Sequence, residues 1–444
     1  MSTLDVHAAT GLLRTFNEAG VLAAADVHVG ERLGALARED DEAVLLGAAL
    51  AVRGPRLGHT LVDVAEIART AAVDVEEAVD VSALPWPDPD DWLTRLDASP
   101  LVAVGDGDDG PDRPLRLVGS ALYLDRYWQE ERAVAADLTS LAVGVDGVED
   151  GRLADLLARL FPDGTDTRQA LAVATAATRR FAVVAGGPGT GKTTTVARIV
   201  ALLTELAGAA PHIALAAPTN TAAVRLQAAV HKAAGELDVS DRVREHLRGL
   251  ERWTLHSLLG RKPGAHSRFK HDRTNRLPHD VVIVDEASMV PLTMMARLAE
   301  AVRPAARLIL VGDPGQLASI EAGVVLGDIV GDATERLALT PATRSRLSVV
   351  TGREVEADVA SPGGVGDGVV VLEKVYRHGR EIAGVAEAIR RGRHDEVLRA
   401  LAGAPEEKIR WIAADPADPS ADPLLAPIRE RVVGTARAVV EAAR

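Results

Sequence analysis

The chain has 444 residues, of which 47% are hydrophobic and 26% are charged. This is the balance of a globular protein with room for roughly two to three domains of about 150 residues each. It has no cysteine, which excludes disulfides and thiolate metal sites. The net charge of −14 argues against a protein that coats DNA with a basic face. It does not exclude a motor that grips one strand in a narrow channel, where the local field decides binding.

The start of the chain gives no signal for export or membrane insertion. Residues Met1–Gly20 include acidic and polar positions and no long apolar run, which argues against a signal peptide. No stretch approaches the roughly 18 uncharged apolar residues that predict a membrane span. We therefore expect a cytoplasmic protein with no membrane partner.

The first predicted domain, residues 1–140, is mainly helical. Asp41–Arg53 places apolar residues at helical spacing behind an acidic start. Pro85–Asp91 is a turn-like break. Leu115–Tyr127 predicts a short β-hairpin that runs into a helix. We interpret this segment as a small docking or scaffolding domain.

The second predicted domain, residues 141–345, alternates strands with helices. Short apolar strands are predicted at Ala182–Ala185, Ile213–Ala217, Val281–Val284 and Leu308–Val311. A helix is predicted at Lys192–Leu206. Continuous apolar strands separated by helices indicate an α/β fold, with a parallel sheet covered by helices on both faces.

The third predicted domain, residues 346–444, gives weaker signals. Ser361–Gly368 is rich in glycine, and we expect a mobile loop. Asp415–Pro427 is rich in proline and aspartate and resembles a linker. Arg377 lies between these two segments, where an arginine is expected to contact the γ-phosphate of ATP as charge develops in the transition state.

A glycine-rich loop follows the first predicted strand of the second domain. Gly186–Thr193 fits the pattern G-x-x-x-x-G-K-[ST] between a strand and a helix. The glycines let backbone amides turn toward phosphate oxygens, and the helix N-terminus adds a positive end. Lys192 is expected to reach the β- and γ-phosphates of ATP, and the Thr193 hydroxyl to bind Mg²⁺. The predicted loop residues are Gly186, Gly187, Pro188, Gly189, Thr190, Gly191, Lys192, Thr193 and Thr194.

Two later strands also end in polar side chains. Val281–Val284 is followed by Asp285, which we expect to hold Mg²⁺, and by Glu286, which we expect to act as the general base on the attacking water. The strand Leu308–Val311 is followed by Gln316, an amide suited to sense the γ-phosphate. The alternatives are a solvated strand end and a polar turn after a core strand.

Other residues are candidates for contacts with the base and with nucleic acid. Gln169, upstream of the glycine-rich loop, offers a donor and an acceptor to adenine, although a helix-surface glutamine is the alternative. Candidates for binding the backbone of single-stranded DNA are Thr219, Asn220, Thr221, Thr254 and His256. The alternative is a capped helix start with a core histidine. A basic stretch nearby is either a strand-binding surface or a solvated loop and comprises Arg252, Arg261, Lys262, Arg268, Lys270 and Arg273.

Five segments in this order resemble superfamily 1 helicases of the 5′→3′ type. They are AGGPGTGKTTT, LAAPTNTAAVRL, TLHSLLG, VVIVDEASMV and LVGDPGQLASIEAGVVLGDI. More narrowly, they are similar to the RecD family, the alpha subunits of exodeoxyribonuclease V. Two N-terminal stretches, DEAVLLGAALAVRGPRLGHTLVDV and RPLRLVGSALYLDRYW, also resemble this family. The resemblance covers Asp41 to about Leu401.

The resemblance implies a RecA-like P-loop ATPase domain, followed by the start of a second motor lobe. It implies an ATP-dependent 5′→3′ DNA helicase subunit that works with RecB-like and RecC-like subunits in a heterotrimer and processes double-strand breaks. By position, Gln169 matches the adenine-reading motif and Arg377 the motif that opens the second lobe. Asn220-Thr221 departs from the usual Gly-Lys and removes a cation from the DNA contact.

The resemblance also sets an expectation for the rest of the chain. Members of the family carry further motifs in a second RecA-like lobe, and these are not found after Arg377. A chain without most of that lobe is expected to bind nucleotide but not to move along DNA. Two rival hypotheses remain: an ATP-binding structural subunit without motor activity, and a stand-alone RecD-like helicase.

Overall fold

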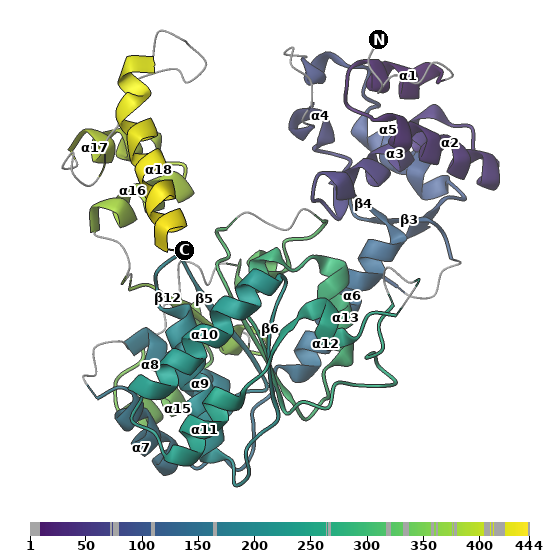
Figure 1. The fold of residues 1–444 in the computed structure, drawn as a ribbon. Coiled ribbons are helices and arrows are strands. Elements are labelled where there is room, and N and C mark those ends of the chain that lie inside the picture. The colour runs from purple at the N-terminus through teal and green to yellow at the C-terminus, as the bar shows by residue number, and fades with distance from the viewer. Residues whose placement is uncertain are drawn as a thin grey trace. The chain divides into compact units, whose positions relative to one another are not determined.

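Figure 1 shows the computed structural model of the chain. The described residues are 9–71, 73, 80–107, 112–162, 167–262, 264, 268–316, 321–331, 337–356, 359–360, 363–374, 376, 380–403, 409, 412 and 422–442. The chain divides into two compact units, Met1–Lys374 and Val375–Arg444. Among the described residues, no helix has both the length and the apolar character needed to cross a membrane.

The N-terminal part of the first unit combines helices with a small sheet. Its helices are α1 (Gly11–Glu18), α2 (Ala24–Ala37), α3 (Glu42–Arg56), α4 (Ile67–Thr70) and α5 (Pro89–Ala98). The sheet has the order β1-β4-β3-β2 and consists of β1 (Leu61–Asp63), β2 (Val102–Val104), β3 (Leu115–Val118) and β4 (Ala121–Leu124). Asp41 starts α3 by accepting hydrogen bonds from the amides of Ala43 and Val44. The antiparallel β3–β4 hairpin leads into α6 (Asp125–Leu141), which confirms the predicted hairpin and helix.

The main sheet of the first unit has six parallel strands in the order β12-β5-β9-β8-β6-β7. Its strands are β5 (Phe181–Gly186), β6 (Ile213–Ala217), β7 (Arg252–Thr254), β8 (Val281–Val284), β9 (Arg307–Gly312) and β12 (Val369–Leu372). The four predicted strands are thereby confirmed. The predicted helix after the glycine-rich loop is α9 (Lys192–Leu206), with the predicted bounds.

Helices cover both faces of this sheet, and each face has its own apolar core (Figure 1). In β5, Ala182 and Val184 belong to one core, while Phe181 and Val183 belong to the other. Because side chains alternate and both faces are buried, the strand is apolar throughout. The first core is completed by α7 (Asp150–Leu160), α8 (Thr167–Thr178), α9, α10 (Asn220–Glu236), α11 (Asp241–Gly249) and α15 (Pro341–Thr351). The second is completed by α6, α12 (Leu255–Leu259), α13 (Leu292–Ala301) and α14 (Val325–Val330).

Two segments join the main sheet from outside the predicted second domain. Helix α6 lies within residues 1–140 apart from its last residue, but Val134 and Leu138 are part of the second core. Strand β12 lies within residues 346–444 and pairs in parallel with β5. By these contacts, the sheet domain extends beyond both predicted boundaries, which were placed at 140/141 and 345/346.

The end of the glycine-rich segment Ser361–Gly368 is anchored, which differs from the expected mobile loop. The buried carboxylate of Asp367 accepts hydrogen bonds from the Thr340 amide at 2.7 Å and from the Thr343 hydroxyl at 2.8 Å. Arg179 forms an ion pair with it at 3.5 Å. These contacts tie the start of α15 to the short 3₁₀ turn Gly366–Gly368 that leads into β12. Ser361 and Pro362 lie outside the described residues.

The second unit is helical where it is described. It contains α16 (Arg380–Arg390), α17 (His394–Gly403) and α18 (Asp422–Ala442). The predicted linker-like stretch Asp415–Pro427 therefore overlaps a helix, because α18 begins at Asp422 and includes Pro427. Residues 415–421 lie outside the described part of the chain.

Candidate active site

The glycine-rich loop joins β5 to α9 at the carboxyl edge of the main sheet. A Cβ added at Gly186 would lie 2.7 Å from Thr190 Oγ1 and 3.1 Å from Leu372 Cβ. Gly189 and Gly191 have φ angles of +80° and +85°, a region that side chains disfavour. Packing and backbone conformation thus require glycine at these positions. The predicted strand–loop–helix context is confirmed, with the turn formed by Gly187, Pro188, Gly189, Thr190 and Gly191.

Lys192 is held against the glycine-rich loop. Its Nζ donates to the carbonyl oxygens of Gly186 at 2.6 Å and Gly187 at 3.0 Å. Thr193, half-buried, and Thr194, exposed, occupy the first turn of α9. Amides in the first turn of a helix lack carbonyl partners within the helix and attract anions. The ammonium group, the helix start and the glycine backbone together make a site suited to phosphate.

Gln169 lies on α8 and is buried, with 3% of its surface exposed. Its Nε2 donates to the carbonyl of Thr190 at 3.3 Å, and its Oε1 accepts from Arg198 at 2.5 Å. The alternative of a helix-surface glutamine is therefore wrong. The amide connects α8 to both the glycine-rich loop and α9, whereas its role in reading adenine stays a prediction.

Asp285 follows β8 and is buried, with 8% of its surface exposed. Its Oδ1 accepts from the Glu286 amide at 2.9 Å, and its own amide donates to the Ala216 carbonyl at 2.9 Å. Burial raises the pKa of Asp285 to about 6; the Glu286 charge adds to this effect, and the Glu286 amide and the charge of Lys192 oppose it. Strands β5 and β8 both pair in parallel with β9, so the glycine-rich loop and the end of β8 lie at the same edge of the sheet.

Glu286 has a φ angle of +53°, in the left-handed region. A side-chain-bearing residue there is strained by the order of 1 kcal/mol or more, and such strain gathers at functional sites. The strained residue ends β8 and starts the 3₁₀ turn Ala287–Met289. The carboxylate of Glu286 is half-buried beside that of Asp285, in an arrangement that suits the predicted general base.

Gln316 lies in a turn after β9, the strand between β5 and β8. Its amide donates to the carbonyl of Asp313 at 3.1 Å, and its side-chain Oε1 accepts from the hydroxyl of Ser288 at 3.0 Å. Ser288 was not among the predicted site residues, because no pattern in its own segment marks it. The structure thus links Gln316 directly to the turn after Glu286.

The predicted strand-contact residues follow β6 and β7, the next two strands of the sheet. Thr219 caps α10 by accepting from the Ala222 amide at 3.2 Å, and Asn220 and Thr221 are exposed in the first turn. Thr254 caps α12 through a reciprocal pair of bonds with Ser257, so its hydroxyl has a structural role.

His256 is exposed on α12 and lies against a buried aromatic ring. Its ring centroid is 5.9 Å from that of Phe269, with the planes tilted by 60°. The alternative of a satisfied core histidine is therefore wrong. An exposed imidazole backed by an aromatic ring is suited to contact a nucleic-acid strand.

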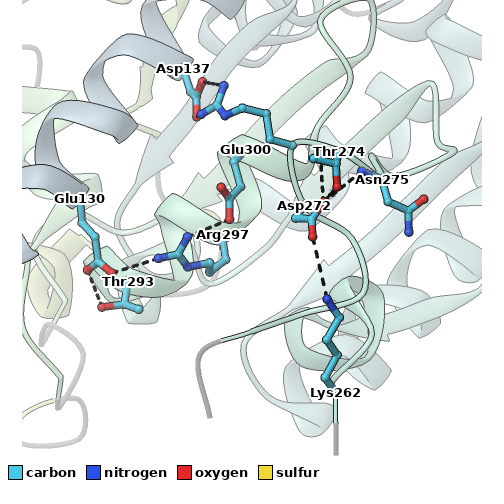
Figure 2. A network of polar contacts seen from close by, with 10 residues as sticks. Glu130, Asp137, Lys262, Asp272, Thr274, Asn275, Thr293, Arg297 and Glu300 are labelled. Atoms are coloured by element: carbon cyan, nitrogen blue, oxygen red, sulfur yellow. Dashed lines mark hydrogen bonds and ion pairs between the residues drawn. The ribbon is translucent and has the colours of Figure 1, made fainter. Parts of the chain in front are cut away.

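All six residues of the basic stretch are exposed, and two of them form ion pairs with aspartate side chains. Lys262 lies 4.0 Å from Asp272, a contact drawn in Figure 2. Arg273 binds Asp137 of α6 with two hydrogen bonds, of 3.0 and 2.8 Å. Figure 2 also shows Glu130 of α6 in contact with two residues of α13, Thr293 and Arg297. Helix α6 thus binds both Arg273 of the basic stretch and helix α13.

Arg377, predicted to approach the γ-phosphate, lies outside the described residues. No group of three or more histidine or acidic side chains that would hold a metal ion occurs in the described part of the chain.

Two families match separate parts of the chain. Residues 18–123 match the family described as RecBCD enzyme subunit RecD, N-terminal domain, and residues 169–322 match the family described as AAA domain. The second match contains the glycine-rich loop, the end of β8 and Gln316. The first covers most of the part that precedes the main sheet.

Three known proteins are similar to the chain over about half of its length or more. The chain is 48% identical over 420 residues to the RecBCD enzyme subunit RecD of Mycobacterium tuberculosis, which is 93% of this chain and 63% of the relative. It is 46% identical over 411 residues to the same subunit of Mycolicibacterium smegmatis, covering 92% of this chain and 64% of the relative. It is 34% identical over 236 residues to the ATP-dependent RecD2 DNA helicase of Deinococcus radiodurans, covering 53% and 28%. The chain is thus similar to RecD proteins along most of its own length, and it spans less than two thirds of the length of these relatives.

Proposed function

We propose that the chain is an ATP-hydrolysing helicase subunit that acts on single-stranded DNA. What supports this most is the convergence of Lys192, Asp285 and Gln316. They follow β5, β8 and β9, which are neighbours in one parallel sheet. Because parallel strands end at the same edge, the three side chains belong to one site. An ammonium, a buried carboxylate and an amide at that edge are the groups that a triphosphate hydrolase uses.

The residues fit a magnesium ion. The hydroxyl of Thr193 and the carboxylate of Asp285 are hard oxygen donors, the type that Mg²⁺ prefers. Burial raises the pKa of Asp285 to about 6, so a divalent cation would stabilise its ionised form. When bound there, Mg²⁺ would supply positive charge to the β- and γ-phosphate oxygens.

Each of the other residues of the site has a separate role in this proposal. Lys192 binds and orients the phosphates. Glu286, held in its left-handed conformation, accepts a proton from the attacking water. Gln316 donates to the γ-phosphate and reports its presence to the strand-contact residues that follow β6 and β7. In this proposal Gln169 keeps its predicted role beside the adenine, and the role of Arg377 rests on the resemblance alone.

The DNA strand in this proposal lies over the carboxyl ends of β6 and β7. Thr219, Asn220 and Thr221 face it from α10, and Thr254 and His256 from α12. The 5′→3′ polarity, the RecB-like and RecC-like partners and the processing of double-strand breaks in the cytoplasm are proposed from the family. We also propose three domains: a docking domain, a RecA-like domain and the start of a second lobe.

ATP hydrolysis and strand displacement test the proposal together. The chain is assayed alone and with its RecB-like and RecC-like subunits, on duplexes with a 5′ or a 3′ single-stranded tail. We expect DNA-stimulated hydrolysis that Lys192→Ala abolishes, no displacement by the chain alone, and displacement from the 5′ tail in the complex. Hydrolysis unchanged in Lys192→Ala would refute the site. Normal hydrolysis without displacement in the complex would favour a structural ATP-binding subunit.

A further inference from the structure

The turn that follows Glu286 touches the side chain expected to sense the γ-phosphate. The hydroxyl of Ser288, a residue with 7% of its surface exposed, donates to Oε1 of Gln316 at 3.0 Å. We propose that Ser288 is a positioning residue, which fixes the orientation of the Gln316 amide and thereby makes the site distinguish ATP from ADP. This inference rests on the proposed function and adds a residue to it.

Backbone packing sets the position of Ser288. A Cβ added at Gly312, the last residue of β9, would lie 3.1 Å from the backbone nitrogen of Ser288 and 3.2 Å from that of Ala287. The 3₁₀ turn therefore rests directly on the end of β9, without an intervening side chain. The left-handed conformation of Glu286 directs the chain into this turn. Ser288 is thus held where the strand that leads to Gln316 ends.

The backbone of Gln316 is held by a different set of bonds. The carboxylate of Asp313 accepts from the Gly315 amide at 3.0 Å, and its carbonyl accepts from the Gln316 amide at 3.1 Å. These bonds form a turn but leave the glutamine side chain exposed. Among the described residues, Ser288 is the group that binds this side chain. In this arrangement the serine hydroxyl donates to Oε1 and holds an amide that would otherwise rotate in solvent.

The chemistry of an amide makes its orientation matter. Oε1 only accepts hydrogen bonds and Nε2 only donates them, whereas phosphate oxygens only accept. With the Ser288 hydroxyl bound to Oε1, the Nε2 group of Gln316 remains to donate to a phosphate. A rotation of the amide by half a turn would set its oxygen against the phosphate oxygens. ADP has no γ-phosphate, so the orientation affects binding of ATP and not of ADP.

The test compares affinities for a nonhydrolysable ATP analogue and for ADP, both with Mg²⁺, by calorimetry on the full chain. For Ser288→Ala we expect analogue affinity to fall roughly tenfold, the effect of one charge-assisted hydrogen bond, and ADP affinity to stay unchanged. Ser288→Thr, which keeps the hydroxyl, should restore the difference. Ser288→Ala combined with Gln316→Ala should be no weaker than Gln316→Ala alone. Ser140→Ala, which removes an exposed hydroxyl on α6, serves as the matched control.

A second variant tests the idea without changing the serine. Gln316→Glu keeps an acceptor for the Ser288 hydroxyl but removes the donor to phosphate, so analogue affinity should fall while ADP affinity stays. Equal losses for both nucleotides in Ser288→Ala, or additive losses in the double variant, would overturn the positioning role. Unchanged affinities in Ser288→Ala would overturn it too, with the proposed function intact. A wild-type chain that binds neither nucleotide would overturn the proposed function and this inference with it.

Discussion

Acidification is expected to weaken the fold through one buried histidine at the amino edge of the main sheet. His279 precedes β8, has 7% of its surface exposed, and its ring lies 4.2 Å from that of His212. Burial lowers the pKa of His279 to about 4, and the charges of His212, His271 and Arg303 act in the same direction, whereas Asp280 opposes them. The folded state therefore resists protonation of this ring, while the unfolded state does not.

The sign and size follow from proton linkage. Between pH 6.5 and about 4 the unfolded chain binds one more proton at His279 than the folded chain does. Stability from this group is complete above pH 6.5 and is lost as the pH falls toward 4. When the pH falls from 7.5 to 5, it passes about 1.5 units below the unfolded pKa of 6.5, and over that span the unfolded chain carries the extra proton. At about 1.4 kcal/mol per unit, the loss is about 2 kcal/mol.

Urea unfolding at pH 7.5 and pH 5 measures this effect when the wild type is compared with His279→Gln. The variant cannot titrate, so its advantage relative to the wild type should grow by about 2 kcal/mol at the lower pH. His28→Gln, which replaces an exposed histidine, should follow the wild type at both pH values. Parallel pH dependence of the wild type and His279→Gln would refute the reasoning.

Three further substitutions give separate expectations. Asp285→Asn should abolish ATP hydrolysis yet leave the metal-free chain at least as stable at pH 8, because it removes a buried carboxylate whose pKa is raised; turnover and thermal unfolding measure the two effects. Gly186→Ala should weaken nucleotide binding at least tenfold in a calorimetric titration, because its Cβ would lie 2.7 Å from Thr190 Oγ1. Asp367→Ala should lower the free energy of unfolding by about 3 kcal/mol in a urea titration, because the amide and hydroxyl of Thr340 and the hydroxyl of Thr343 lose their buried acceptor.

The candidate site at the carboxyl edge of the sheet could be predicted because its signals are local. A buried parallel strand is apolar along its whole length, and a polar residue directly after it must lie at the sheet edge. Asp285 directly follows β8, and the turns that lead to Lys192 and Gln316 directly follow β5 and β9. The order of the strands, which brings these residues together, was not predicted, because no local pattern encodes it.

Other features depend on contacts between distant residues. Strand β7 has three residues and begins with an exposed arginine, so it lacks an apolar pattern. Helix α6 shows one buried face, but the sequence does not say that this face packs on α13. Ser288 acquires its role from a partner 28 residues further along the chain. Burial of Gln169 and exposure of His256 are likewise set by neighbours and not by their own segments.

The central claim is that Lys192 and Asp285 bind one magnesium-complexed triphosphate at the carboxyl edge of the sheet. Calorimetric titration of the full chain with a nonhydrolysable ATP analogue and Mg²⁺ tests it most directly. We predict one bound equivalent, with affinity reduced about a hundredfold or more in Lys192→Ala and strongly reduced when Mg²⁺ is removed. The same affinity in Lys192→Ala as in the wild type, or no heat of binding in the wild type, would contradict the account.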